Sequence, residues 1–197
     1  SESRDDTGSI AREFTDRVIV RPWPGYVAQK NFAAGQATHD WIFSLDADER
    51  VSPALAEEIK AMVAGAPSVP GYRVPRVTFH LGRWLRSTDW YPDYQLRLYD
   101  RRRARWAGRL VHESVTADGA VIDLRGELLH YAYRYIAHHV QTMDRYTSLA
   151  ARQMFEEGRR AGWFDLAVHP PAAFLRNYLL RGGFRDGSCS NFRRRKE

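Results

Sequence analysis

A short hydrophobic run occupies residues 41–45, Trp-Ile-Phe-Ser-Leu, and polar residues flank it on both sides. A run of this length and composition predicts a buried β-strand. It need not alternate between apolar and polar residues if both faces of its sheet are covered. Two carboxylates, Asp46 and Asp48, follow directly. The pattern therefore places them at the carboxyl end of a strand, where open α/β sheets bind their ligands.

The residues on either side of this run predict an alternation of strands and helices. Residues 18–20, Val-Ile-Val, fit a short strand, and the Pro/Gly-rich residues 21–25 fit a loop. Residues 26–37 predict a helix that leads into the 41–45 strand. Ser52 and Pro53 are a typical helix start, and this helix extends to residue 63. A strand–helix–strand order is typical of an α/β fold.

The second half of the chain changes from strands to helices. Strands are predicted at residues 71–80 and 95–99, with an aromatic loop at 84–94 between them. Asp118-Gly119 predicts a hairpin turn that joins residues 111–115 to residues 120–124. A long helix over residues 135–160 and an apolar segment over 172–180 follow. The pattern thus predicts a sheet layer and then a helical C-terminal part.

Composition adds a strong basic character to this picture. The 197 residues suffice for one domain with a sizeable core. The net charge is +6, and 27 of the 30 basic residues are Arg, which binds phosphate and carboxylate groups in a bidentate manner. This charge suits nucleotide phosphates, nucleic acid or an anionic membrane surface. The single Cys189 excludes a disulfide within these residues, and no apolar run approaches the ~18–20 residues of a transmembrane helix.

Asp46 and Asp48 carry the sharpest chemical signal in the sequence. Two aspartates at one strand end repel each other unless a cation lies between them, and Mg²⁺ or Mn²⁺ prefers such hard oxygen ligands. The same D-x-D pattern also occurs in ordinary turns that precede a helix, so the motif alone leaves both interpretations open. Phosphatases of the haloacid dehalogenase type need Thr or Val at the position that Arg50 holds, which argues against that chemistry.

Residues 40–51, D-W-I-F-S-L-D-A-D-E-R-V, closely resemble the D-W-I-x-x-L-D-A-D-E-R-V segment of glycosyltransferase family 2. The resemblance is to the branch that includes bacterial lipopolysaccharide core β-glucosyltransferases. Further motifs follow in the family's order, at residues 1–11, 23–25, 29–33, 91–93, 96–98, 111–113 and 129–130. The resemblance covers residues 1–187. It implies an α/β fold of the GT-A type, with a mixed sheet and helices on both faces over residues 1–130, and a helical C-terminal extension over residues 131–197.

The family pattern starts with a strand and a loop that cradle the nucleobase, whereas this sequence starts inside the next loop. After residue 187 the sequence departs from the family. From this comparison we expect a chain that is truncated at its N-terminus and altered at its C-terminus. The alternatives to an active enzyme are an inactive fragment and a basic module that binds membrane or nucleic acid.

The resemblance implies an inverting transfer of a sugar from a nucleotide-sugar donor, a UDP-sugar above all, to a saccharide or lipid-linked acceptor of the bacterial envelope. Mg²⁺ or Mn²⁺ would stabilise the leaving diphosphate. Asp48 and Asp46 are the expected metal ligands, together with His112. For both His112 and His130 the alternative is a structural histidine that only forms hydrogen bonds. The candidate donor-binding residues are Asp5, Lys30, Asp46, Arg97 and Trp90.

The acceptor hydroxyl needs a base, which must be a carboxylate or a histidine within reach. The candidates are Glu113 and Asp93, and the sequence favours Glu113 because it follows His112 at a predicted strand end. Asp93, inside the aromatic loop, fits a lid on the acceptor side. The aromatic residues of this region either stack on sugar rings or pack on the core: Trp84, Trp90, Tyr91 and Tyr94.

Residues 172–180 and the arginines around them fit an anionic membrane surface. These arginines are Arg176, Arg181, Arg185 and those of the tail at 193–196. We therefore expect a cytoplasmic protein, peripheral on the inner face of the bacterial plasma membrane. No helix-turn-helix, zinc or ribonucleoprotein motif supports nucleic acid as a partner.

Overall fold

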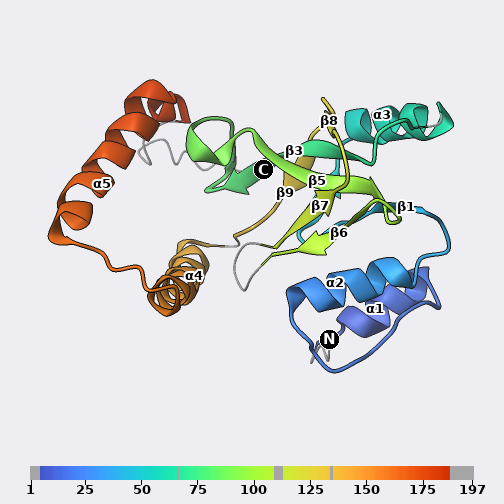
Figure 1. Cartoon of the computed structure of the whole chain (residues 1–197). Coiled ribbons are helices and arrows are strands. Elements are labelled where there is room, and N and C mark those ends of the chain that lie inside the picture. The colour runs from blue at the N-terminus through green and yellow to red at the C-terminus, as the bar shows by residue number, and fades with distance from the viewer. Residues whose placement is uncertain (1–4, 66, 109–112, 134, 187–197) are drawn as a thin grey trace.

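The computed structural model describes residues 5–65, 67–108, 113–133 and 135–186 (Figure 1). Its helices are α1 (Thr7–Phe14), α2 (Tyr26–Gly35), α3 (Pro53–Ala64), α4 (Ile136–Glu156) and α5 (Trp163–Leu175), with the short helical turns η1 (Thr88–Trp90), η2 (Arg176–Leu180) and η3 (Gly183–Asp186). Its strands are β1 (Trp41–Phe43), β2 (Glu49–Val51), β3 (Gly71–His80), β4 (Arg83–Leu85), β5 (Asp93–Asp100), β6 (Ala104–Ala107), β7 (Ser114–Ala117), β8 (Ile122–Asp123) and β9 (Leu128–His130).

The sheet of the described residues is mixed, as the sequence predicts. It has the strand order β1-β5-β3-β9-β2, and β4 and β8 also pair with β3. The pairs of β3 with β8 and β9 are parallel, whereas the other pairs are antiparallel. Strands β6 and β7 form a separate antiparallel ribbon. The long strand β3 is therefore the centre around which the other strands are arranged.

Alternate residues of β1 face opposite sides of the sheet, and both sides are covered. Trp41 and Phe43 pack against the core cluster that contains Leu55 of α3. Ile42 packs against a second cluster, with Val27 of α2 and residues of the β6–β7 ribbon. This arrangement confirms the α/β fold with helices on both faces. Although covered, β1 is half-buried, and β5 is its only partner among the described strands.

Two local predictions are wrong because strand formation depends on pairing with distant segments. Residues 18–20 form no strand, since no described strand pairs with them to complete the hydrogen bonds. Asp118 and Gly119 do form a turn, with Gly119 at a φ of 126°. However, β7 pairs with β6, and the chain beyond the turn places β8 beside β3 in parallel. The predicted hairpin is thus replaced by a crossing from the ribbon to the main sheet.

The start of α3 is as predicted, and its packing fixes β9. Ser52 accepts a hydrogen bond from the Leu55 amide at 3.2 Å, and Pro53 is the first helical residue. A Cβ atom on Gly126, just before β9, would lie 2.4 Å from Cα of Leu55, so no side chain fits there. Glu58 also accepts hydrogen bonds from the Gly126 amide at 2.7 Å and the amide before it. Helix α3 and the beginning of β9 are therefore in direct backbone contact.

The helical C-terminal part projects away from the sheet (Figure 1). Helix α4 lies within the predicted residues 135–160. Helix α5 is longer than the sequence indicates, because it continues through Pro170 and Pro171, which remove two amide donors from the helix. The helix then passes into η2, whose turn is wider than that of an α-helix. No helix in the described part of the chain is long and apolar enough to span a bilayer.

Candidate active site

The two aspartates lie in the tight turn that connects β1 to β2. The backbone closes this turn with a hydrogen bond from the Glu49 amide to the Asp46 carbonyl, at 3.0 Å. The Glu49 carboxylate in turn accepts a hydrogen bond from the Asp46 amide, at 2.9 Å. Glu49 is therefore part of the turn, and it begins β2, a strand that the sequence pattern did not reveal. The aspartates lie at the end of β1, as predicted.

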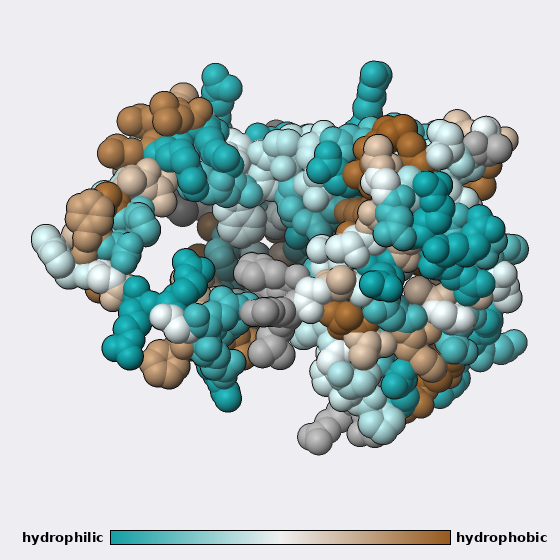
Figure 2. All heavy atoms as spheres, in the orientation of Figure 1, coloured by the Kyte–Doolittle hydropathy of each residue, from teal (hydrophilic) through white to brown (hydrophobic). Residues whose placement is uncertain are grey.

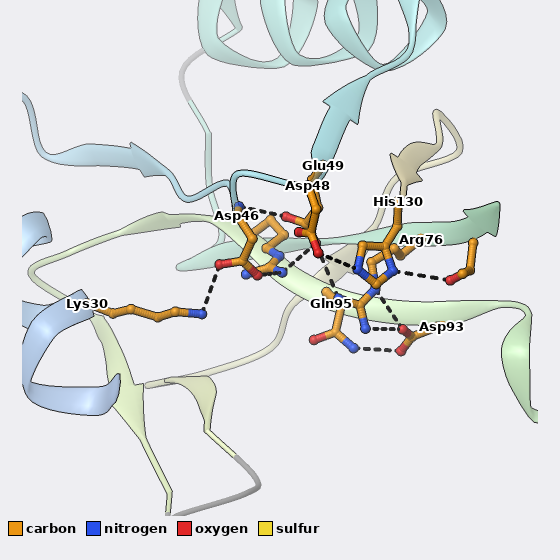
Figure 3. A network of polar contacts seen from close by, with 10 residues as sticks. Lys30, Asp46, Asp48, Glu49, Arg76, Asp93, Gln95 and His130 are labelled. Carbon is orange, nitrogen blue, oxygen red and sulfur yellow. Dashed lines mark hydrogen bonds and ion pairs between the residues drawn. The ribbon is translucent and has the colours of Figure 1, made fainter. Parts of the chain in front are cut away.

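Asp46 is held between two cations that come from different elements (Figure 3). Its Oδ1 lies 3.1 Å from Nζ of Lys30 on α2, and its Oδ2 accepts a hydrogen bond from Arg97 on β5 at 2.6 Å. Burial alone would raise the pKa of Asp46, but Arg97 and Lys30 together lower that pKa below its ordinary value. The structure thus brings together three of the predicted donor-site residues.

Arg97 is the buried centre of the network. Its side chain is 3% exposed, and it also binds Glu49, which is 0% exposed, at 2.6 Å. Arg76 on β3 lies 3.3 Å from the same Glu49 oxygen. The Arg97 guanidinium also lies 5.8 Å from the ring centroid of Trp106. A buried charge pair of this kind requires both partners, because removing one leaves the other uncompensated.

Asp48 has a different partner, which the sequence pattern left undecided. His130, the last residue of β9, places its Nε2 3.3 Å from Oδ2 of Asp48, and its Nδ1 lies 3.2 Å from the Thr78 hydroxyl (Figure 3). The hydrogen bond from His130 lowers the pKa of Asp48. Strand β9 pairs with both β2 and β3, which positions this histidine beside the acidic turn. The register of these strands identifies His130 as the partner of Asp48. This register cannot be inferred from the spacing of sequence motifs.

A polar cavity of about 260 Å³ opens beside His130. Asp93, at the start of β5, lines this cavity together with Trp90, Tyr133 and Asp89. Arg76 binds the Asp93 carboxylate through two nitrogens at 2.6 and 2.9 Å, and Gln95 donates to its other oxygen at 2.6 Å. Asp93 is therefore oriented by two neighbours and faces a cavity that also reaches the partner of Asp48.

Two aromatic residues that line this cavity, Trp90 and Tyr133, pack against imidazole rings. The rings of Trp90 and His80 are stacked, with centroids 5.9 Å apart and planes 8° apart. His139 of α4 lies 4.1 Å from Tyr133 and 4.8 Å from His80, measured between ring centroids. Of the predicted aromatic residues, Trp84 packs elsewhere, against Phe79 and Tyr131. Tyr91 donates a hydrogen bond to Glu127.

The remaining predicted site residues lie outside this network. Asp5 accepts a hydrogen bond from the Thr7 amide at the beginning of α1, and no contact joins it to the acidic turn among the described residues. Glu113 is half-buried just before β7 and has no hydrogen bond or ion pair with a described residue. His112 lies outside the described residues. The roles proposed for these three residues stay predictions.

A larger cavity among the described residues is separate from this chemistry. It has a volume of about 920 Å³ and lies between the N-terminal end of α2 and helix α4. Its lining is mostly apolar and includes Trp23, Tyr26 and Leu149. No residue of the acidic network lines it. We therefore place the candidate active site at the smaller polar cavity, where the ionisable groups converge.

The donor groups around the acidic turn restrict how a metal ion could bind. No three His, Cys, Asp or Glu side chains of the described residues group as they would around a metal ion. Both oxygens of Asp46 already accept contacts from Lys30 and Arg97. Among the described residues, Asp48 forms an ion pair with His130 and none with a Lys or Arg, although the charge of Arg76 also lowers its pKa. This pair fits an ion such as Mg²⁺ or Mn²⁺ that takes its other ligands from water and a substrate diphosphate.

The acidic turn predicts a defined pH dependence of stability. Because the pKa values of Asp46 and Asp48 are lowered in the folded state, their stabilisation is fully present above their unfolded pKa. It is lost as the pH falls through their folded pKa. We expect the difference in unfolding free energy between wild type and Asp46→Asn to shrink between about pH 5 and about pH 2. Urea unfolding across this range measures it.

The exposed Asp144 on α4 provides the control for this experiment, because no ion pair joins it to a described residue. Asp144→Asn should leave the stability close to that of wild type at each pH. If the difference in unfolding free energy between wild type and Asp46→Asn stays constant across this pH range, the paired carboxylate does not control the acid transition.

Comparisons with known proteins give the family. Residues 1–118 match the sequence profile of "Glycosyl transferase family 2". The chain is 32% identical over 194 residues to the "Lipopolysaccharide core biosynthesis glycosyltransferase LpsC" of Rhizobium meliloti (strain 1021), covering 95% of this chain and 72% of that protein. It is 31% identical over 196 residues to an uncharacterized glycosyltransferase of Rickettsia typhi, covering 93% of this chain and 67% of that protein.

These matches agree with the acidic turn at the end of β1 and with the mixed sheet that carries it. The similarity to the relatives extends beyond residue 118 into the helical C-terminal part, since it covers 93% or more of the chain. The chain belongs to glycosyltransferase family 2.

Proposed function

We propose that this glycosyltransferase moves a sugar from a UDP-sugar, with inversion, onto a saccharide or lipid-linked saccharide of the lipopolysaccharide core. The similarity to the lipopolysaccharide core biosynthesis glycosyltransferase of Rhizobium meliloti supports the choice of acceptor. The observation that carries the proposal is the acidic turn, in which Asp46 contacts Lys30 and Arg97 while Asp48 contacts His130. This arrangement places cationic groups and a free carboxylate edge side by side, as a sugar diphosphate requires.

On the donor side, Lys30 is the residue best placed to meet the diphosphate. Its side chain is 22% exposed, and its ammonium lies over the ring of Trp106, 4.1 Å from the centroid. A lysine ammonium has three donors on a flexible stem, so it can contact Asp46 and a phosphate oxygen together. Arg97 is buried and has two carboxylate partners, so its role is to hold Asp46 and Glu49 in place.

For the metal, we propose Asp48 as the principal ligand, with His130 beside it. Asp46 stays a candidate ligand only if Lys30 and Arg97 release one of its oxygens. A bound Mg²⁺ or Mn²⁺ would act as a Lewis acid for the charge that develops on the diphosphate. Thr78 contacts the other nitrogen of His130 and thereby orients the imidazole toward Asp48.

For the base, we propose Asp93 and keep Glu113 as the alternative. Asp93 lines the cavity that also contains His130, and Arg76 and Gln95 fix its orientation. In the reaction, an acceptor hydroxyl attacks the anomeric carbon and gives its proton to the Asp93 carboxylate. The bond from the anomeric carbon to the diphosphate oxygen breaks on the opposite side, and the nucleoside diphosphate leaves with the electron pair.

Replacement of the base separates the two candidates. We expect Asp93→Asn to lower kcat by about 10²–10⁴-fold, the usual contribution of a general base, while donor binding is retained. Glu113→Gln should leave kcat close to that of wild type. Initial rates with a saturating donor measure both effects. A large loss in Glu113→Gln together with a small loss in Asp93→Asn would reverse the assignment.

The function itself is tested with a panel of UDP-, GDP- and TDP-sugars in the presence of Mn²⁺. Release of the nucleoside diphosphate is the readout, with and without a lipopolysaccharide core acceptor. We expect turnover with one class of donor and an increase when the acceptor is added. A chain that shows neither turnover nor metal-dependent nucleotide binding would not be an active transferase.

We further propose that the chain acts in the cytoplasm, at the inner face of the plasma membrane. The arginines near the C-terminal end of the described chain suit the negative surface potential of that leaflet. An anionic membrane surface is therefore the third partner, beside the donor and the acceptor.

A further inference from the structure

The last described segment, residues 163–186, forms an arm that carries an unusual amount of exposed apolar surface. It consists of α5, η2 and η3, and α5 stands away from the sheet in Figure 1. Its exposed large side chains include Trp163 at 81%, Leu166 at 72% and Leu180 at 84%. In Figure 2, brown apolar atoms gather at the upper left, over the C-terminal end of α5. A protein that exposes apolar side chains over two helical segments usually has a partner that covers them.

Polar contacts centred on Asp89 form a clamp that holds the arm against the loop at residues 87–90, and Ser87 also donates a hydrogen bond to Asp186 of the arm. Asp89 of η1 accepts hydrogen bonds from Arg176 at 2.7 Å, from Asn177 at 2.9 Å and from Arg181. The Thr88 amide also donates to the Arg181 carbonyl at 3.3 Å. These contacts attach the arm to the loop at residues 87–90.

The same loop forms the rim of the candidate acceptor cavity. Asp89 and Trp90 line this cavity opposite Tyr133, and Asp93 lies in its wall. The clamp therefore connects the apolar arm directly to the place where an acceptor hydroxyl would meet the proposed base. A partner that binds the arm is held at a fixed position relative to the cavity.

The chemistry of the arm fits a lipid bilayer with an anionic surface better than a second copy of the chain. Its highly exposed apolar side chains are spread over both α5 and η2, whereas a helix pair buries a narrow stripe along one helix. Residues 159–186 contain five Arg and two Asp. Arg159 and Arg160 have no acidic partner among the described residues, and they line a hollow of about 700 Å³.

The walls of that hollow add a second argument for lipid. It lies between the end of α4 and α5, and its apolar lining includes Met154, Phe155 and Leu166. Its polar lining consists of the two arginines, His169 and one carboxylate, Asp165. Apolar walls with two arginines against one carboxylate suit an acyl region beneath an anionic headgroup. Trp163 is 81% exposed, and tryptophan is a residue type enriched at membrane interfaces. Helix α5 has 13 residues, fewer than the ~20 that cross a bilayer, so such an arm would lie in the plane of the interface.

We propose that residues 163–186 form an in-plane docking arm for an anionic bilayer, and that the Asp89 clamp fixes the acceptor cavity relative to that surface. The docking does not require turnover, but it names the segment that would meet the membrane surface of the proposed function, so both parts of the proposal rest on that function.

Docking is tested with the full chain and vesicles of phosphatidylcholine, with and without phosphatidylglycerol. We expect binding to the phosphatidylglycerol vesicles that weakens with salt and falls by about tenfold or more in Trp163→Ser/Leu180→Ser. Phe14→Ser on α1, which replaces a side chain that is also 81% exposed, is the matched control and should bind like wild type. Thermal unfolding checks that each variant is folded. Equal vesicle binding by wild type, the double variant and Phe14→Ser would overturn the docking. It would also be overturned if ultracentrifugation showed a dimer that only the double variant loses.

The clamp is tested with two charge-matched variants. Arg176→Gln/Arg181→Gln breaks the contacts with Asp89, whereas Arg159→Gln/Arg160→Gln removes the same charge and leaves them intact. Both should bind vesicles more weakly to a similar degree. The clamp variant alone should show a further rise of about tenfold in KM for vesicle-embedded acceptor, with kcat and the KM for a soluble acceptor fragment unchanged. Equal KM values in the two variants would overturn the clamp. Absence of turnover in wild type with vesicle binding intact would instead count against the proposed function.

Discussion

Asp48→Ala should abolish the metal-dependent binding of a nucleoside diphosphate and lower kcat/KM by about 10³-fold or more. A bound metal contributes several kcal/mol of charge stabilisation, and each ~1.4 kcal/mol corresponds to a factor of ten. Asp48 is the aspartate of the turn that forms no direct ion pair with a Lys or Arg of the described residues, although the charge of Arg76 adds to the hydrogen bond from His130 in lowering its pKa. Isothermal titration calorimetry of UDP binding, with and without Mn²⁺, measures the loss of affinity.

The control for this variant is Asp123→Ala, which removes an exposed aspartate that pairs with Arg73 on the far part of β3. It should bind UDP like wild type in the presence of Mn²⁺. His130→Gln should weaken the metal-dependent part of binding by about 10–100-fold, the range seen when a group next to a metal is lost. If Asp48→Ala binds UDP and Mn²⁺ with unchanged affinity, Asp48 is not a metal ligand.

Arg97→Met should destabilise the fold by about 3–5 kcal/mol, since it leaves the buried Glu49 carboxylate with a longer contact to Arg76 as its remaining ion pair, beside the hydrogen bond from the Asp46 amide. The same substitution at Arg73, on the neighbouring strand, removes an exposed ion pair and should cost only about 0–1 kcal/mol. The free energy of unfolding in urea measures both.

A second substitution tests the reason for this loss. If the cost comes from the uncompensated carboxylate, Glu49→Gln in the Arg97→Met background should recover part of the stability. Equal losses for Arg97→Met and Arg73→Met would mean that the buried pair contributes no more than a surface pair. Both experiments measure only the free energy of unfolding. Their results therefore do not depend on which sugar donor the protein uses.

The sequence predicts those elements whose signals are local. Strand β3 has its predicted bounds, and the helix after Ser52 begins where the capping pattern places it. Both depend on residues close together in the chain. The acidic turn is of the same kind, because a strand and its terminal carboxylates are adjacent in sequence. Local chemistry thus specifies the position of the site along the chain.

Features that depend on the pairing of distant segments were not predictable in this way. Val18 to Val20 have strong strand propensity, yet they form no strand because no described partner lies beside them. Asp118-Gly119 forms a turn, but the strands it connects belong to different sheets. The contact between His130 and Asp48 has the same origin. Only the register of β9 against β2 and β3 places His130 beside Asp48.

The close contact of Gly126 with Leu55 has a consequence for how this enzyme tolerates change. Because β9 carries His130 and begins just beyond Gly126, the spacing between two backbones in the core sets the position of a side chain in the active site. Gly126 touches neither cavity nor acidic turn. A side chain at position 126 would push β9 away from α3 and would therefore move His130 relative to Asp48. We expect such a substitution to change the geometry of the candidate site as well as the stability of the fold.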